Sequence, residues 1–310
     1  MLTFAKIREV IKKHAYLILA HNKPQQLNAL ISLLDDERND IYLHIDKKAA
    51  WGPEMIGKTK FSQLHFIERQ AVNWGGYSMV SEEMKMLKEC VKEDYSYIHL
   101  LSGMDFPIKC QDYIHDFCDR SGRQFIYFLD TESAKDAARS RIRYYWPLQE
   151  WIGCGTSKFY IILKRLQRGL VCIQKALGIN RIKDLDSSDI AKGSQWFSIT
   201  GDFARYIVSQ EDFVCKHFRN TSCSDEVFIQ ILSKWSKRMD LAGSCRYIIW
   251  KDRNDCHPNV LSPNDEDALL KTDKLFARKF DCDRYPETLN MIKRVIAESQ
   301  KEFNKTAPGR

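Results

Sequence analysis

The sequence predicts an α/β fold in which a mostly parallel central sheet is flanked by helices. Over the first 130 residues, short apolar runs alternate with segments whose apolar residues recur at helical spacing, and this alternation is typical of parallel sheets covered by helices. Polar turns that contain Gly or Pro separate many of the runs, which ends one element before the next begins. A chain of 310 residues suffices for one large domain or two closely joined ones.

Five strands and three helices are expected before residue 130. The expected strands are the apolar runs at residues 14–20, 40–45, 64–67, 97–101 and 125–129. Pro24 suits the first turn of a helix, and the apolar residues that follow it fall on one helical face. A second helix follows the turn at 73–76, and a third begins near Gln111.

The run at 97–101 and the turn after it occupy the expected centre of the sheet. The turn contains Ser102, Gly103 and Asp105. In open α/β sheets, ligands bind in the crevice beyond the carboxyl ends of the strands, so these residues form a site hypothesis. A plain turn in which Asp105 caps the next helix explains the same residues, and both interpretations stay open. Neither standard phosphate-binding glycine loop occurs in the chain.

The pattern changes after residue 130, so we divide the chain into a first half, residues 1–130, and a second half, residues 131–310, closely joined as one domain. The second half contains expected strands at 193–199 and 247–250 and expected helices at 201–209 and 286–302. Ser224 is expected to cap a further helix, with Asp225 and Glu226 in its first turn, where the helix dipole favours carboxylates.

Composition and charge narrow the functional classes without selecting one. The 44% hydrophobic and 12% aromatic content is that of a globular protein. A net charge of +7 is compatible with an anionic ligand, a membrane surface or nucleic acid. The chain has no run of 18 apolar residues, and its start lacks the order of a secretory signal, so we expect a cytoplasmic protein. The ten cysteines form no CxxC pair, which favours free thiols over a zinc site.

A basic amphipathic segment at 158–175 stands out within the region from 130 to 189. An ordinary surface helix, a contact with a membrane surface or lipid acceptor, and a contact with nucleic acid all fit its composition. The sequence has no RNA- or DNA-binding motif to support the last interpretation.

Several motifs occur in the order found in one known family. They are AYLILAHNKP at 15–24, IYLHIDKK at 41–48, LSGMDFPIK at 101–109, GSQWFSIT at 193–200, SDE at 224–226, the strand of Arg246 and LFARKFD at 275–281. Together they resemble the core-2/I-branching β-1,6-N-acetylglucosaminyltransferases, whose relatives include the peptide O-xylosyltransferases. The resemblance covers most of the chain.

The resemblance implies a GT-A-like fold whose first half binds a nucleotide sugar and whose second half binds the acceptor and carries the catalytic residues. The family inverts the anomeric centre without a divalent metal, so a UDP-sugar co-substrate and no further cofactor are implied. Such transfer needs a base for the acceptor hydroxyl and positive charge for the departing diphosphate. The resemblance assigns Glu226 as the base and Arg246 and Lys279 as the diphosphate-binding cations. Glu226 should lie near a partly apolar wall, because its pKa must not be too low to accept a proton.

The resemblance also assigns residues to the two substrates. It places the uridine near Ala20, Asp46 and Trp74, with Asp46 accepting hydrogen bonds from the uracil or ribose and Trp74 stacking on the base. Ser194 and Trp196 are expected towards the acceptor. Core packing is an alternative role for both tryptophans.

Two Asp-x-Asp sequences bear on the metal. Most GT-A enzymes hold a metal with such a motif, and it occurs here at 184–186 and 281–283. Neither directly follows an early strand, so both are interpreted as surface carboxylates and no metal is expected. Asp105 is expected to hold the structural loop near Gly103 rather than to take part in the chemistry.

The chain also departs from the animal members of the family. It has no membrane anchor in its sequence and is shorter, which suggests a bacterial, cytoplasmic relative, peripheral to the inner face of the membrane. The region from 130 to 189 shows no match, so the animal acceptor specificity is not carried over.

Three functions are therefore compared. The first is an inverting, metal-independent transfer of N-acetylglucosamine or xylose from a UDP-sugar to a glycan or lipid-linked acceptor in surface polysaccharide synthesis. The second is a non-catalytic UDP-sugar- or carbohydrate-binding scaffold, against which the joint presence of Glu226, Arg246 and Lys279 argues. The third is nucleic-acid binding, and the expected partners do not include it.

Overall fold

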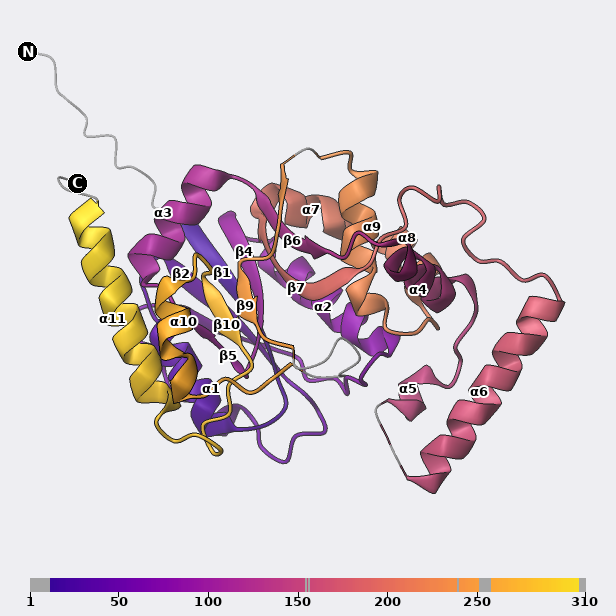
Figure 1. Cartoon of the computed structure of the whole chain (residues 1–310), viewed down its shortest axis with the longest axis horizontal. Coiled ribbons are helices and arrows are strands. Elements are labelled where there is room, and N and C mark those ends of the chain that lie inside the picture. The colour runs from indigo at the N-terminus through magenta and orange to yellow at the C-terminus, as the bar shows by residue number, and fades with distance from the viewer. Residues whose placement is uncertain (1–11, 154, 156, 239, 251–257, 307–310) are drawn as a thin grey trace, which may run out of the picture.

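The computed structural model describes residues 12–153, 155, 157–238, 240–250 and 258–306, and its central feature is a seven-stranded sheet (Figure 1). The strand order is β3-β2-β1-β4-β7-β6-β8. The strands are β1 (Lys13–Ala20), β2 (Asn39–Ile45), β3 (Gln63–Ile67), β4 (Tyr95–Ser102), β6 (Gln124–Phe128), β7 (Gly193–Thr200) and β8 (Leu241–Ala242). Strand β7 runs antiparallel to both of its neighbours, and the other neighbouring pairs are parallel. The predicted α/β fold with a mostly parallel sheet is confirmed.

Helices cover both faces of this sheet. They are α1 (Pro24–Leu34), α2 (Tyr77–Cys90), α3 (Gln111–Ser121), α4 (Glu132–Arg143), α5 (Gln149–Ile152), α6 (Lys158–Ala176), α7 (Gly201–Ser209), α8 (Glu211–Phe218), α9 (Phe228–Trp235), α10 (Glu266–Lys271) and α11 (Thr288–Thr306). Strand β1 shows why two layers form, because successive side chains of a strand point to opposite faces. Ala15 and Leu17 pack in one core with α2, α7 and α9, whereas Tyr16 and Ile18 pack in the other with α1, α3 and α11.

A small second sheet lies beside the end of β4. In it β10 (Phe276–Arg278) pairs antiparallel with β5 (Asp105–Pro107) and parallel with β9 (Arg246–Ile248). Pro107 is tolerated because β5 is an edge strand. Because of this pairing, Arg246 and the Arg278–Lys279 pair lie near the loop that follows β4, the central strand. Of its three strands, the sequence predicts only the one at 247–250, which corresponds to β9.

The expected helix cap at Ser224 is wrong. Residues Ser224–Glu226 form a single 3-10 turn, η2, which follows Cys223 at φ 47°, and α9 begins only at Phe228. The Ser224 hydroxyl is buried and has no hydrogen-bond partner among the described residues. The apolar residues of α9 are buried in the core, and their packing, rather than a capping side chain, fixes where this helix begins.

The two halves of the chain share one sheet. Strand β7, from the second half, lies between β4 and β6 of the first half, and β5 pairs with β10. Helix α6 stands apart from the sheet, at the opposite end of the molecule from α11 (Figure 1). The eight cysteines that the structure describes are free. Within the described ranges, every helix is too short or too polar to cross a membrane.

Candidate active site

The carboxyl ends of three neighbouring strands bring Ala20, Asp46 and Gly103 together. The Asp46 amide donates to the Ala20 carbonyl at 2.8 Å, and the Gly103 amide donates to the Leu19 carbonyl at 2.9 Å. Asp46 is buried, and its Oδ1 accepts from the Lys48 amide at 2.8 Å. Parallel strands end at a common edge, which explains why these three residues meet, and their assignment to a binding site stays a prediction.

Asp105 holds the loop after β4. Its carboxylate is buried and accepts from the Ser102 amide at 3.0 Å and from the Ser102 hydroxyl at 2.8 Å. The same carboxylate lies 3.7 Å from Nε of Arg278. With these bonds made, Asp105 fixes the path of the backbone between β4 and β5.

Lys48 links the strand-end cluster to the loop that carries Trp74. Its Nζ donates to the Val72 carbonyl at 2.5 Å and to Asn73 Oδ1 at 2.9 Å. The side chain of Trp74 is 41% exposed, so this tryptophan is not a core aromatic and its ring is accessible for stacking. The packing alternative for Trp74 is therefore excluded.

The Trp74 loop also contacts the loop of Glu226. The Cys223 amide donates to the Gly75 carbonyl at 2.7 Å. Gly75 has φ +67°, and an added Cβ would lie 2.7 Å from the Cys223 sulfur. Only glycine suits both the backbone angle and the close approach. The Trp74 loop and the SDE turn are thereby held against each other.

Glu226 lies at the end of this turn between two cations. Its Oε2 is 2.7 Å from Nη1 of Arg141 and 3.0 Å from Nζ of Lys192, and 36% of the side chain is exposed. Burial alone would raise the pKa of Glu226, but Arg141 and Lys192 lower it below the ordinary value. The partly apolar wall was expected to keep this pKa from falling, and the two ion pairs lower it instead, so the carboxylate stays charged.

The neighbouring carboxyl groups have the opposite preference. Burial, reinforced by Glu226, raises the pKa of Asp225 to about 7. Burial, reinforced by Asp225, raises the pKa of Glu83 well above its usual range. Gln195 donates to Glu83 at 2.6 Å. Oxygens of Asp225 and Glu83 are buried without a partner among the described residues. At neutral pH, Glu226 is therefore ionised beside an interior that favours protonated carboxyl groups.

Arg246 is buried and its guanidinium is engaged by the protein. Nη2 donates to the carbonyls of Leu100 at 2.9 Å and Phe197 at 2.5 Å, and Nη1 donates to the Ser198 hydroxyl at 3.1 Å. In this conformation the residue joins β4 to β7 and does not present a free fork to a ligand.

Lys279 lies closer to the strand-end cluster. Burial lowers the pKa of His21, Asp46 raises it, and the positive charge of Lys279 lowers it again, so these three side chains share one electrostatic environment. Burial, and then the charge of Arg278, lowers the pKa of Lys279 itself. A half-buried cation at the carboxyl edge of the sheet is suited to binding an anion.

Trp196 and Ser194 lie on β7. The guanidinium carbon of Arg278 sits 4.0 Å above the centre of the Trp196 ring, which joins the two sheets through a cation–π contact. Trp196 is half-buried and packs against the core, whereas the Ser194 hydroxyl accepts from the Trp196 amide at 3.3 Å. Both residues have structural contacts, and their assignment to the acceptor side stays a prediction.

The two Asp-x-Asp sequences engage cations of the chain. Asp184 lies 2.7 Å from Lys216, and Asp281 and Asp283 both pair with Lys23. Two groups have ligand atoms within 4.8 Å of one another: the buried His14–His99–Cys118, and His14–His115–Asp119, in which Asp119 is exposed. Their ring nitrogens already form a hydrogen-bonded chain from Asp119 through His14 and His99 to Ser198. We assign no metal to them.

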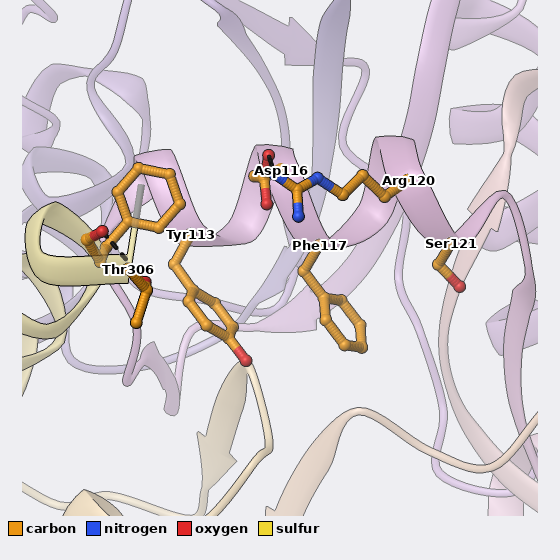
Figure 2. A pocket seen from close by; sticks show the side chains of 7 residues that line it. Tyr113, Asp116, Phe117, Arg120, Ser121 and Thr306 are labelled. Carbon is orange, nitrogen blue, oxygen red and sulfur yellow. Dashed lines mark hydrogen bonds and ion pairs between the residues drawn. The ribbon is translucent and has the colours of Figure 1, made fainter. Parts of the chain in front are cut away.

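A separate groove of about 470 Å³ lies between α3 and α11 (Figure 2). Tyr113 and Phe117 point to the same side of α3, while Arg120 pairs with Asp116 at 3.0 Å. None of the predicted site residues lines this groove, so it is distinct from the strand-end cluster.

Comparison with known proteins gives the family. Residues 14–268 match the family model described as Core-2/I-Branching enzyme. The chain belongs to the Core-2/I-Branching enzyme family. This is a family of glycosyltransferases, and the resemblance inferred from the motifs is confirmed.

The similar curated proteins are xylosyltransferases. Xylosyltransferase oxt of Drosophila pseudoobscura pseudoobscura is 22% identical over 83% of this chain and 30% of its own length. Xylosyltransferase 2 of Rattus norvegicus and of Homo sapiens are 20% and 19% identical over 90% of this chain and 33% of their own length. The chain thus spans about a third of the curated relatives it matches.

Sequence reasoning missed four side chains around the candidate site of this Core-2/I-Branching family member. They are His21, Arg141, Lys192 and Arg278. His21 and Arg278 stand inside the motifs at 15–24 and 275–281, directly beside residues that were assigned. Arg141 is 85 residues from Glu226 in the chain, so only the fold reveals that ion pair.

Proposed function

We propose that this protein transfers a sugar from a UDP-sugar to a hydroxyl group of a glycan or lipid-linked acceptor, with inversion at the anomeric carbon. The observation that carries the proposal is the contact between the Trp74 loop and the Glu226 turn through Gly75 and Cys223. This contact joins the turn of the ionised Glu226 to the loop that Lys48 ties to Asp46. Ligands of open α/β sheets bind beyond the carboxyl ends of the strands, where Asp46 lies.

The donor side is assigned to Ala20, Asp46 and Trp74. The Asp46 carboxylate accepts hydrogen bonds from the uracil or ribose, and the exposed face of Trp74 stacks on the base. The hydrogen bonds of Lys48 hold the loops of these two residues together. The donor site is therefore preorganised by contacts within the chain.

Glu226 takes the proton from the acceptor hydroxyl as that oxygen attacks the anomeric carbon. A base must be unprotonated before it acts, and Arg141 and Lys192 keep this carboxylate ionised. Both cations approach Oε2, so Oε1 is assigned as the accepting oxygen. The ion pairs also fix the rotamer of Glu226, at the cost of lower basicity.

Positive charge stabilises the departing diphosphate. Lys279 is suited to this role because it lies half-buried beside His21 and Asp46. The resemblance also assigns Arg246, whose guanidinium must exchange main-chain acceptors for phosphate oxygens if it acts directly. Protein cations at these positions supply the charge that a metal supplies in other GT-A enzymes.

The names of the similar proteins and of the family suggest which donor sugars to test. The similar proteins are named xylosyltransferases, and the family description names branching enzymes, so xylose and N-acetylglucosamine are the two donors to test first. The acceptor is a hydroxyl on a glycan or lipid-linked oligosaccharide, and the reaction belongs to surface polysaccharide synthesis.

The test is turnover of UDP-sugars by the full chain in EDTA. Glu226→Gln should lower kcat by about 10²–10⁴-fold because proton transfer is lost, with little change in UDP affinity measured by calorimetry. Lys279→Met should instead weaken UDP binding. Glu298→Gln, on the exposed surface of α11, is the matched control. Full kcat in the Glu226 variant would contradict the assigned base, and turnover that requires manganese would contradict the metal-independent mechanism.

A further inference from the structure

Helix α6 presents a polar face to the protein. Gln167, Val171 and Gln174 are its buried residues. Gln174 accepts from the Tyr145 amide at 2.7 Å and donates to the Tyr145 carbonyl at 2.8 Å, while Gln167 accepts from the Leu148 amide at 3.0 Å. A surface helix normally turns its apolar stripe to the core. Helix α6 does the opposite, because two of its three buried residues are glutamines.

The large apolar side chains of α6 point away from the protein. Phe159 and Ile162 are each 63% exposed, Leu166 is 53% exposed and Ile173 is 58% exposed. Their spacing of three, four and seven residues places them along one stripe of the helix. Single exposed apolar residues are common, but a continuous stripe marks a surface that contacts something else.

The charges of α6 all have one sign. The helix contains five cations and no acidic residue. The cations are Lys158, Lys164, Arg165, Arg168 and Lys175. Lys158 and Arg165 directly precede Phe159 and Leu166, so positive charge flanks the apolar stripe. An apolar stripe bordered by cations is typical of helices that lie in the interface of a membrane.

We propose that α6 docks this protein on an anionic membrane surface, with Phe159, Ile162, Leu166 and Ile173 inserted between lipid headgroups. A second copy of the chain fits less well, because pairing two such helices would bring cations together without an acidic partner on either. Nucleic acid would use the cations but would leave the aliphatic stripe in water. Anionic lipid satisfies both features. Figure 1 shows α6 at the edge of the molecule, free of the sheet.

The test is co-sedimentation of the full chain with lipid vesicles. We expect binding to vesicles of phosphatidylcholine with about 30% phosphatidylglycerol and much weaker binding to pure phosphatidylcholine, because the cations are attracted to anionic headgroups. Ile162→Ser/Leu166→Ser and Arg165→Gln/Arg168→Gln should each weaken binding at least about tenfold. Phe61→Ser removes a 57% exposed aromatic residue outside α6 and should bind like the wild type.

The possible results distinguish a lipid surface from a second copy of the chain as the partner of α6. Wild-type-like binding by the serine variant, or no binding of the wild type to anionic vesicles, would overturn the proposal. Self-association without lipid that the serine variant abolishes would also overturn it and assign the stripe to a second copy. Near-ultraviolet circular dichroism checks that the variants fold. We expect them to fold because the substituted residues are exposed. Glu226→Gln should bind vesicles normally, so membrane docking and catalysis are tested independently.

Discussion

Residues only one or two contacts apart in this site hold opposite charge states. Glu226 is kept ionised by Arg141 and Lys192, whereas burial raises the pKa of Asp225 to about 7 and that of Glu83 well above its usual range. The residue type alone therefore does not determine whether a carboxyl group in this site is ionised. An ionised carboxylate at the rim and buried carboxyl groups of raised pKa behind it follow from which cations the fold supplies.

Glu83 allows this difference to be measured as stability. Its pKa in the folded protein is raised above the unfolded value of 4.5. Its contribution to stability is thus fully present below pH 4.5 and is lost as pH rises through the folded pKa. Glu83→Gln removes the titration while keeping an acceptor for Gln195. We expect the variant to gain about 1.4 kcal/mol of unfolding free energy relative to the wild type for each pH unit above 4.5 until the folded pKa is reached.

Urea unfolding at pH 5, 6 and 7 would check this expectation. Glu89→Gln is the matched control, because Glu89 lies on the same helix with an exposed side chain. Its stability difference from the wild type should be nearly independent of pH over this range. A Glu83→Gln difference that is also constant with pH would show that Glu83 is ionised in the folded protein.

At the scale of the element, β7 carries the residues assigned to the acceptor and depends on one glycine. An added Cβ at Gly193 would lie 1.8 Å from the Tyr127 carbonyl oxygen and 2.5 Å from Gln230 Nε2. Gly193→Ala should therefore destabilise the protein by at least about 2 kcal/mol, because backbone and not a flexible side chain must move. Gly169→Ala in α6, where nothing lies within 4 Å of the added Cβ, should instead stabilise its helix by about 0.5–1 kcal/mol. Urea midpoints of both variants test the contrast, and equal midpoints would contradict it.

The elements that the sequence predicts well are those with a strong local signal. Strands β1, β2 and β4 are buried on both faces and read as continuous apolar runs. Strands β5 and β10 have three residues each, and their pairing depends on residues far away in the chain. The segment of α6 is evident from sequence, but which of its faces meets the protein is not, because its buried contacts are made by glutamines.

The candidate site divides in the same way. Ala20 ends one predicted strand, and Asp46 and Gly103 lie just beyond two others, so their meeting at one edge of the sheet follows from topology. The ion pairs of Glu226 and the main-chain bonds of Arg246 join segments distant in sequence. Sequence periodicity carries no signal for such contacts, which is why the lowered pKa of Glu226 and the engagement of Arg246 were not predicted.

At the scale of the whole molecule, residues 1–130 and 131–310 are not separable structures. Residues Tyr97 to His99 of β4 pair with Thr200 to Ser198 of β7, and β6 pairs with the other edge of β7. Phe106 of β5 is fully buried and packs 5.3 Å from Phe280. Each half therefore completes the core of the other.

Cutting the chain after residue 130 tests this interdependence. The isolated fragment 1–130 loses the strand between β4 and β6 and exposes the edge of β5, so we expect no cooperative urea transition and binding of the dye ANS to exposed apolar surface. The full chain should unfold in one transition that coincides by far-ultraviolet circular dichroism and tryptophan fluorescence. Co-expression of fragments 1–130 and 131–310 is the control, because restored pairing of β7 should return cooperative unfolding. A fragment 1–130 that unfolds cooperatively and binds UDP on its own would instead establish residues 1–130 as an independent domain.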